Sequence, residues 1–360
     1  GTGGAELPAG SAYAAHQPGP RGRPVADLAL IEPGSGWPAG TGWCYPEWDE
    51  HHQRYRPEWC TVLDFAPVPG DARWRRLPER DDGVRRRLAR LGLGLRLTSH
   101  QADGEDLDMD AVVQFQVDLM TGAAPHEDIY RQSRRVRRDL SVLVLVDVSG
   151  SAVEQDREGA AVHDHQLDAA ATLVGELEAL GDRVACYGFR SRGRSAVHLL
   201  RIKAFDHRFD AGARDRLARL EPVGFTRLGG AVRHGTEVLR RDGGTSRRLL
   251  VVLSDGFPYD DGYEGNYGEA DARRSVAEAR RDGIGALCVS LGGATGTEAL
   301  RRVFGAAACV GTDTLAGLRH RIDALFLQAI GDAEGARRDS RRAQLSPGVR
   351  GVHGEEAMTR

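Results

Sequence analysis

The sequence predicts an α/β fold, a doubly wound and mostly parallel sheet flanked by helices, with a smaller N-terminal region before it. The first observation is an unbroken apolar run, Ser141–Val146, which is typical of a strand buried on both faces of a parallel sheet. A second apolar run, Arg247–Leu253, also leads into a carboxylate. Around these runs, helical and strand-like segments alternate, which is the third indication of a doubly wound sheet.

The 360 residues are sufficient for one large domain or two smaller ones. Residues 1–42 are rich in Gly, Pro and Ala without a helical or strand period, so we expect a flexible linker there. Residues 43–138 should form a family-specific N-terminal region and residues 139–331 the α/β domain. Residues 332–360 are expected to form a loosely ordered polar tail.

Two Trp-containing acidic segments, Cys44–Asp49 and Tyr55–Cys60, open the N-terminal region and look like two strands or a clasp around a turn. Between them, His51 and His52 could bind a metal together with Glu47 and Asp49. Adjacent histidine side chains rarely face one site, however, and no later histidine follows at a ligand spacing. The alternative to a metal site is an ordinary charged turn.

The rest of this region contains two expected helices and a basic stretch. Val84–Leu95 has leucines at helical spacing with arginines between them, which indicates a surface helix with one buried stripe. Asp103–Asp110 places acids at the start of the next helix, where the macrodipole favours them. The segment differs from an EF-hand Ca²⁺ loop in its spacing and lacks the closing Glu. Tyr130–Asp139 is a basic arm, either a solvated face or a docking surface.

After Ser151 the expected elements alternate regularly, and His163 and His165 near the start of the first helix should be exposed. In order, the predicted elements are a helix over 159–180, strands over 183–189 and 196–202, a short helix over 215–220, a helix over 231–240, the strand 247–253, a helix over 270–281, a strand over 285–291, and helices over 297–304 and 315–330.

The candidate site lies in the loops that follow the two apolar runs. Asp147, Ser149 and Ser151 alternate, so a loop leaving the strand can bring three oxygens to one point. In an open α/β sheet such a loop lines the ligand crevice. Oxygen ligands without a nearby Cys suit Mg²⁺ better than a softer metal, although Ser and Asp are also common helix N-caps. Thr226 and Asp255 should reach the same edge of the sheet.

These five residues together resemble the metal-ion-dependent adhesion site (MIDAS) of von Willebrand factor A domains, and the likeness covers roughly residues 139–331. The resemblance implies that the three hydroxyls contact Mg²⁺ directly, while the aspartates often act through water. Neutral hydroxyls leave the ion under-neutralised, so an open position would attract a carboxylate from a partner. The tyrosines of Tyr263–Gly268 would supply apolar contact around the ion.

A narrower resemblance, from about residue 43 to 331, is to the NorD/CbbO family. It implies an adaptor or co-chaperone of a MoxR-type AAA+ ATPase (NorQ or CbbQ), acting on a client metalloenzyme or on Rubisco. Likeness to NorD implies maturation of nitric oxide reductase, with loading of its non-haem iron; likeness to CbbO implies Rubisco activation. The resemblance rests on five segments: Tyr45–Asp49, Tyr55–Cys60, Asp106–Asp108, Tyr187–Gly193 and Tyr263–Gly268.

Composition narrows the function classes. The net charge of -3 and the pI of about 6.5 give no reason to expect a nucleic-acid partner or an anionic membrane. No apolar stretch approaches the roughly 18 residues that a membrane-spanning helix needs, so we expect no membrane insertion. An ATPase is excluded because Lys203, the only lysine, does not follow a glycine-rich loop. We expect no enzymatic activity; a Mg²⁺-dependent hydrolase and an extracellular adhesion module are the alternatives.

The five widely spaced cysteines are typical of a reducing cytosol, so we expect a cytoplasmic protein. Cys186 and Cys288 lie in apolar strand-like runs and should be small core residues. The chain starts at Gly1 without a methionine, so a longer natural N-terminus that carries targeting information stays an open alternative.

Overall fold

The computed structural model describes residues 21–25, 41–67, 76–91, 95–135, 138–153, 161–254, 257–291, 297–305, 307–312 and 315–345. Its strands are β1 (Arg23–Val25), β2 (Thr41–Asp49), β3 (Arg54–Phe65), β4 (Leu95–Gln101), β5 (Asp106–Leu107), β6 (Tyr130–Arg135), β7 (Leu140–Asp147), β8 (Arg183–Ser191), β9 (Val197–Lys203), β10 (Arg247–Leu253), β11 (Gly285–Leu291) and β12 (Ala308–Thr312). Its helices are α1 (Asp82–Ala89), α2 (Met109–Thr121), α3 (Val162–Ala179), α4 (Ala211–Ala218), α5 (Leu228–Asp242), α6 (Gly265–Arg281), α7 (Thr297–Phe304), α8 (Leu315–Arg319) and α9 (Ile322–Leu345), with a 3₁₀ turn over Gly150–Val153.

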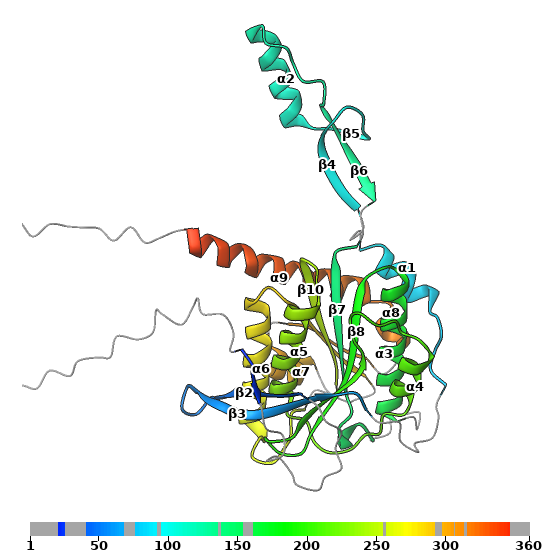
Figure 1. Ribbon diagram of the computed structural model, residues 1–360, viewed down its shortest axis with the longest axis vertical. Coiled ribbons are helices and arrows are strands. Elements are labelled where there is room, and N and C mark those ends of the chain that lie inside the picture. Colours follow the sequence, from blue (N-terminus) through cyan, green and yellow to red (C-terminus); the bar gives the residue numbers. More distant parts are fainter. Residues whose placement is uncertain are drawn as a thin grey trace, which may run out of the picture.

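Nine strands form one sheet in the order β1-β2-β3-β9-β8-β7-β10-β11-β12, with helices on both faces (Figure 1). β8, β7, β10, β11 and β12 are parallel to one another, and β9 runs antiparallel to β8. The predicted doubly wound, mostly parallel α/β fold is therefore confirmed. We call the edge of the sheet at which the parallel strands β7 and β10 end its carboxyl edge.

β7 lies in the interior of the sheet, between β8 and β10, and separates two apolar cores. Val142, Val144 and Val146 pack into the core beneath α1, α3, α4, α8 and α9. Leu143 and Leu145 pack into the opposite core, beneath α5, α6 and α7. Because alternate residues of a strand face opposite sides, a strand covered by helices on both faces must be apolar throughout.

The sheet crosses the boundary expected between residues 138 and 139. Val62–Phe65 of β3 pair in parallel with Val197–Leu200 of β9, and β2 pairs with β3 as an antiparallel hairpin. The two expected Trp-containing strands are thus present, but they extend the main sheet. Pairing with β3 covers the edge of β9, which would otherwise present unpaired backbone groups.

A second, three-stranded sheet in the order β4-β6-β5 carries α2 and forms an arm, residues 95–135, that extends away from the main sheet (Figure 1). The expected acidic helix start is present, because Asp108 caps α2 and accepts a hydrogen bond from the Asp110 amide at 3.3 Å. The basic stretch expected over Tyr130–Asp139 is strand β6 as far as Arg135.

Several elements differ from the sequence-based expectations. The helix expected over 315–330 is two helices, and the second, α9, continues to Leu345 through part of the expected polar tail. The apolar spacing that buries Ile330 also buries Ala333, so the helix packs beyond the predicted end. β12 was not predicted. Most of residues 1–42 and all of 346–360 lie outside the described residues.

The burial predicted for individual side chains is confirmed for the cysteines and wrong for one histidine. Cys186 and Cys288 are fully buried, as predicted. His163 was expected to be exposed but is buried, with Nε2 2.8 Å from the carbonyl oxygen of Leu220. In the part of the chain that the structure describes, no helix is both long and apolar enough to cross a membrane.

His198 should make folding stability depend on pH. It is buried in β9 against the Phe65 ring, and burial, together with Arg190 and Arg192, lowers the pKa of His198 to about 4. In the unfolded chain the pKa of the His198 imidazole is near 6.5, so between pH 6.5 and 4 the unfolded chain binds a proton that the folded chain does not. The free energy of unfolding therefore falls as the pH is lowered through this range, by up to about 3 kcal/mol. Urea unfolding across this range should show a shallower loss for His198→Gln, while His207→Gln, an exposed control, should follow the wild type. Identical pH profiles for all three proteins would contradict this assignment.

Candidate metal centre

Four of the five predicted site residues lie together at the carboxyl edge of the sheet. Asp147 ends β7, and its Oδ1 accepts a hydrogen bond from the Ser149 amide at 2.9 Å. The Oγ atoms of Ser149 and Ser151 are 2.9 Å apart. Thr226 Oγ1 lies 3.4 Å from each carboxylate oxygen of Asp147. The fifth residue, Asp255, lies outside the described residues.

A further hydroxyl was not predicted. Ser254 Oγ donates a hydrogen bond to Asp147 Oδ2 at 2.7 Å, and Ser254 is fully buried. The parallel register explains its position, because Leu253 of β10 is paired with Val146 of β7, and the next residue of each strand is therefore a neighbour. The signal in the sequence was the position of Ser254 directly after the second apolar run.

Backbone hydrogen bonds hold the loops of the site together. The Gly150 amide donates to the Gly224 carbonyl at 2.9 Å, and Thr226 and Tyr259 exchange two backbone hydrogen bonds of 2.7 and 3.0 Å. Gly224 has a φ of +79°, and a Cβ there would lie 2.7 Å from the Ser191 carbonyl oxygen. Only glycine fits this turn without strain, so the loop that carries Thr226 is fixed against the end of β8.

The chemistry of the cluster fits a hard divalent cation. Its donors are one carboxylate and several hydroxyls, and oxygen-only sets of this kind suit Mg²⁺. Asp147 is 1% exposed, whereas Ser151 is exposed, so the cluster reaches from the interior to the surface. Ser149, Ser151 and Thr226 would hold the ion with Asp147, and the ion would supply positive charge for an incoming anionic ligand.

The residue after Thr226 is held by buried ion pairs. Arg227 Nη1 contacts both carboxylate oxygens of Glu47 at 2.8 and 2.9 Å, its Nε donates to Asp260 at 3.0 Å, and its Nη2 donates to the Asp261 carbonyl at 2.7 Å. Burial by itself lowers the pKa of Arg227, but the two carboxylates more than offset this and raise it above its ordinary value. Because Glu47 lies in β2, the N-terminal hairpin is tied to the site.

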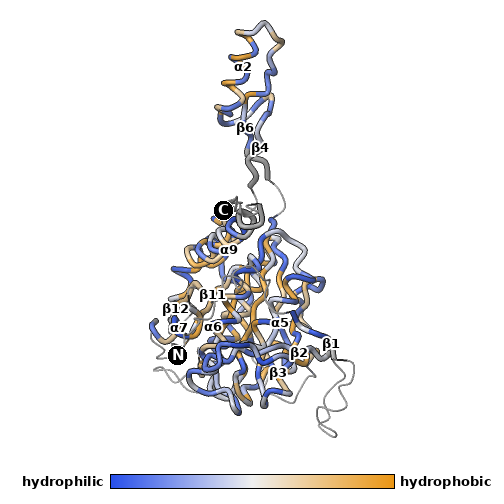
Figure 2. Tube along the Cα trace, turned by 90° about the vertical axis from the view of Figure 1, so that its left-hand side faces the viewer, coloured by the Kyte–Doolittle hydropathy of each residue, from blue (hydrophilic) through white to orange (hydrophobic). Residues whose placement is uncertain are grey.

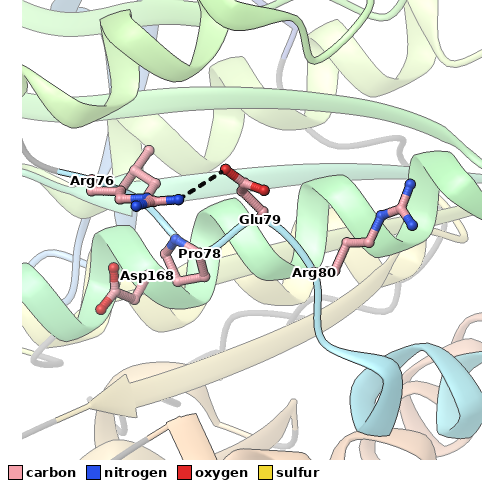
Figure 3. Close-up of a pocket in the computed structure, with 6 residues that line it drawn as sticks. Arg76, Pro78, Glu79, Arg80 and Asp168 are labelled. Atoms are coloured by element: carbon pink, nitrogen blue, oxygen red, sulfur yellow. Dashed lines mark hydrogen bonds and ion pairs between the residues drawn. The ribbon is translucent and has the colours of Figure 1, made fainter.

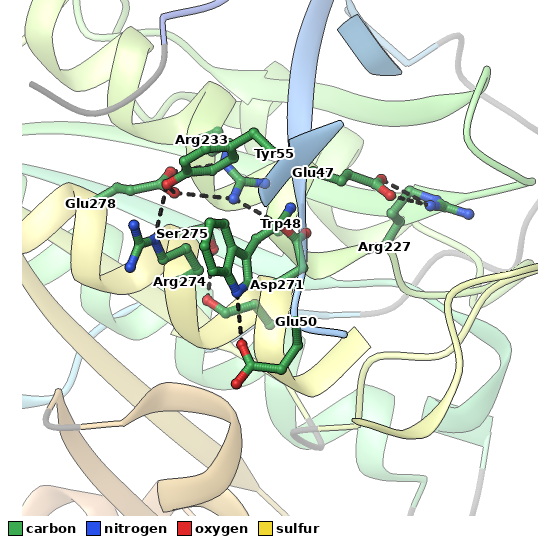
Figure 4. A network of polar contacts seen from close by, with 12 residues as sticks. Glu47, Trp48, Glu50, Tyr55, Arg227, Arg233, Asp271, Arg274, Ser275 and Glu278 are labelled. Atoms are coloured by element: carbon green, nitrogen blue, oxygen red, sulfur yellow. Dashed lines mark hydrogen bonds and ion pairs between the residues drawn. The ribbon is translucent and has the colours of Figure 1, made fainter. Parts of the chain in front are cut away.

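A second group of buried ion pairs joins the same hairpin to α5 and α6 (Figure 4). Arg233 of α5 contacts Asp271 and Glu278 of α6, each at 2.8 Å. The Trp48 amide donates to Asp271 at 2.7 Å, and the Tyr55 hydroxyl donates to Glu278 at 2.6 Å. The Trp-containing acidic segments singled out in the sequence therefore attach the hairpin to the α/β domain.

The tyrosines expected around the ion lie elsewhere. Tyr263 is fully buried, and its hydroxyl donates to Asp271 at 2.7 Å, while Tyr267 donates to Glu47 at 3.1 Å. The prediction failed because these hydroxyls bind the buried carboxylates of the hairpin and α6. Among the described residues, the large aromatic side chains that stay exposed flank the metal loops instead: Phe225, Phe257 and Tyr259.

The alternative metal site at His51 and His52 is not supported. The Asp49 carboxylate binds His52 at 2.9 Å and Arg56 at 2.6 Å, and Glu47 is occupied by Arg227. Within the described ranges, no group of three or more His, Cys, Asp or Glu side chains could hold a metal. The candidate centre at Asp147 depends on hydroxyls, which are ligands of a different kind.

A groove of about 540 Å³ is formed where residues 76–80 cross α3 (Figure 3). It is lined by Arg76, Leu77, Pro78, Glu79, Arg80 and Asp168. Arg76 and Glu79 pair across it at 3.5 Å, and both side chains are largely exposed. An open, charged groove is unlike the concave apolar pockets that bind small molecules, and it shares no residue with the hydroxyl cluster.

The sequence profile of the von Willebrand factor type A domain matches residues 142–257, which contain the hydroxyl cluster. The chain therefore contains such a domain. In fold it is also similar to the manganese-loaded TRAP protein of Plasmodium vivax (14% identity, 53% of this chain and 73% of that chain, TM-score 0.36). The SpRpn10 VWA domain is similar at 12% identity, over 52% of this chain and 92% of that chain, with a TM-score of 0.38.

Curated relatives of this chain are named NorD. NorD of Brucella suis is 37% identical over 257 residues, which cover 69% of this chain and 39% of that protein. NorD of Stutzerimonas stutzeri is 33% identical over 274 residues, 75% of this chain and 44% of that protein. The chain is thus a NorD-like protein with a von Willebrand factor A domain. It spans about two fifths of the length of the curated relatives it matches.

Proposed function

We propose that this chain is an adaptor of a MoxR-type AAA+ ATPase and binds a carboxylate of that partner through Mg²⁺ at its MIDAS. The single observation that carries the proposal is the convergence of Ser149, Ser151 and Thr226 on Asp147. Neutral hydroxyls compensate little of the charge of a divalent cation, so an anionic ligand completes the site favourably. Because the resemblance to NorD implies maturation of nitric oxide reductase, the relatives named NorD favour the reductase as the client.

The surface around the site supports a protein partner. Phe225 and Tyr259 are about half exposed, and their rings contact each other at 5.7 Å between centroids. Exposed aromatic side chains are enriched at the centres of protein interfaces, where they bury large area at low entropic cost. A partner loop with an acidic residue beside apolar ones would satisfy both the cation and this aromatic rim.

No observation favours the hydrolase alternative. In the described part of the chain, the cluster contains no histidine that could act as a general base, and the Asp147 carboxylate accepts hydrogen bonds from the Ser149 amide and the Ser254 hydroxyl. The proposed role is therefore recognition without catalysis. The cytoplasmic location and the lack of direct contact to nucleic acid are proposed from the cysteine spacing and the net charge of -3.

The test is co-purification with the cognate MoxR-type ATPase. We expect a complex in Mg²⁺ that is lost in EDTA and weakened at least about tenfold by Thr226→Ala, because carboxylate binding to a hard cation is strongly electrostatic. Asp255→Ala should behave in the same way. Thr245→Ala, whose hydroxyl contacts Ser141 and the Arg247 carbonyl away from the site, is the matched control and should bind normally. Equal complex formation in every case would exclude the metal site as the docking point.

A further inference from the structure

The outer face of α2 is apolar and uncovered. Met109, Val113, Val117 and Met120 recur at intervals of four, four and three residues and therefore lie on one face of the helix. All four are exposed, Met120 by 85% and Val113 by 60%. Figure 2 shows hydrophobic stretches in orange along α2, at the far end of the arm. We call these four residues the α2 stripe.

The contacts within the arm leave the stripe facing outward. Ala111, in the first turn of α2 and away from the stripe, is the buried residue of this helix, so no part of the small sheet covers the stripe. Asp108 fixes the start of the helix, since it accepts from the Arg131 side chain at 2.9 Å and its amide donates to the Ile129 carbonyl at 2.8 Å. Contiguous apolar surface held outward on an ordered element marks an interaction site, because exposing it to water is unfavourable.

The charge around the stripe selects the kind of occupant. The arm, residues 95–135, contains eight Asp and Glu and four Arg, and the arginines lie in β4 and β6 and not in α2, so the arm is acidic although the whole chain has 49 basic residues. Two such arms would repel each other, and nucleic acid or an anionic membrane would also be repelled. Helices that lie on membranes are instead rich in Lys and Arg on their polar face.

We propose that the α2 stripe docks in an apolar groove of a partner protein whose rim carries Lys or Arg. This is helix-in-groove recognition, in which residues at successive turns anchor the helix. The flanking carboxylates would pair with the basic rim and speed association. The surface is separate in sequence from the hydroxyl cluster, so the chain presents two independent docking points.

The test uses the full chain with a stand-in for that surface, a short fluorescent helical peptide with Leu on one face and Lys on the other. We expect binding that weakens with salt and weakens at least about tenfold in Val113→Asp/Val117→Asp. The matched control, Gln114→Asp/Thr121→Asp, adds the same charge on another face of α2 and should bind like the wild type, because Gln114 and Thr121 are also exposed. EDTA should have no effect, which distinguishes this site from the metal centre.

Several outcomes would overturn the proposal. These are no binding of the Leu–Lys peptide to the wild type, equal weakening by the stripe and control variants, or equal binding of a peptide with Glu in place of Lys. If sedimentation showed that the wild type is a dimer and that Val113→Asp/Val117→Asp is a monomer, the stripe would bind a second copy of the chain. If the wild type floated with phosphatidylcholine–phosphatidylserine vesicles and Val113→Asp/Val117→Asp did not, the stripe would bind a membrane.

Discussion

Arg227→Ala should destabilise the protein by about 3–5 kcal/mol, the cost of leaving buried charges without their partner. Glu47 and Asp260 are both fully buried, and Arg227 contacts each of them at 3.0 Å or less. Removing the guanidinium leaves two carboxylates in the interior without this cation. Urea unfolding monitored by fluorescence would measure the loss.

Two further variants make the measurement specific. Arg227→Lys keeps the charge but loses the planar fork that contacts both oxygens of Glu47, so it should fall between alanine and wild type. Arg23→Ala removes an exposed ion pair with Glu58, whose side chains are 76% and 58% accessible, and should change stability by less than about 0.5 kcal/mol. A loss below about 1 kcal/mol in Arg227→Ala would contradict the interpretation that these charges act as a buried unit.

The position of Arg227 connects stability to the site. Its amide donates to Ser191 Oγ at 3.0 Å, and its neighbour Thr226 is bonded through the backbone to Tyr259, the residue before Asp260. The Arg227–Glu47 pair thus holds the Thr226 loop from one side and the β2–β3 hairpin from the other. A chain that begins at residue 139 would lose Glu47, so the matched domain profile is narrower than the structural unit.

The main sheet and most of the site could be predicted because their signals are local. Apolar runs bounded by polar residues identified β10 and β11 to the residue, and the alternation after β7 placed three oxygens in one loop. These steps depend on periodicity or on a rule of sheet topology. Thr226 does not end a parallel strand; its loop reaches the same edge because Phe225 pairs with Ser191 at the end of β8 and Thr226 pairs with Tyr259.

The predictions that were missing or wrong concern residues that pair over a long distance in the sequence. Nothing local indicates that Glu47 pairs with Arg227, 180 residues later, or that β3 adds to the edge of β9. Tyr263 was predicted to supply apolar contact around the ion, but its hydroxyl binds Asp271 in the interior. Such partners become visible only when the sheet order is known.

Asp147→Asn should weaken specific Mg²⁺ binding by about 100-fold or more, because the number of charged ligands largely sets affinity for hard cations. Isothermal calorimetry would measure it, with Asp82→Asn as a control that neutralises an exposed carboxylate in α1. Unchanged affinity in Asp147→Asn would remove this residue from the metal centre.

The same substitution separates metal binding from folding. Asn keeps the volume of Asp147 and a carbonyl oxygen that can still accept from the Ser149 amide, so in EDTA the variant should lie within about 1–2 kcal/mol of wild type. Mg²⁺ at about 100 times its dissociation constant should stabilise the wild type by about 2.7 kcal/mol, since only the folded chain brings these oxygens together. The melting temperature of wild type and of Asp82→Asn should therefore rise with Mg²⁺, and that of Asp147→Asn should not. If Mg²⁺ stabilised all three equally, the ion would bind elsewhere on the chain.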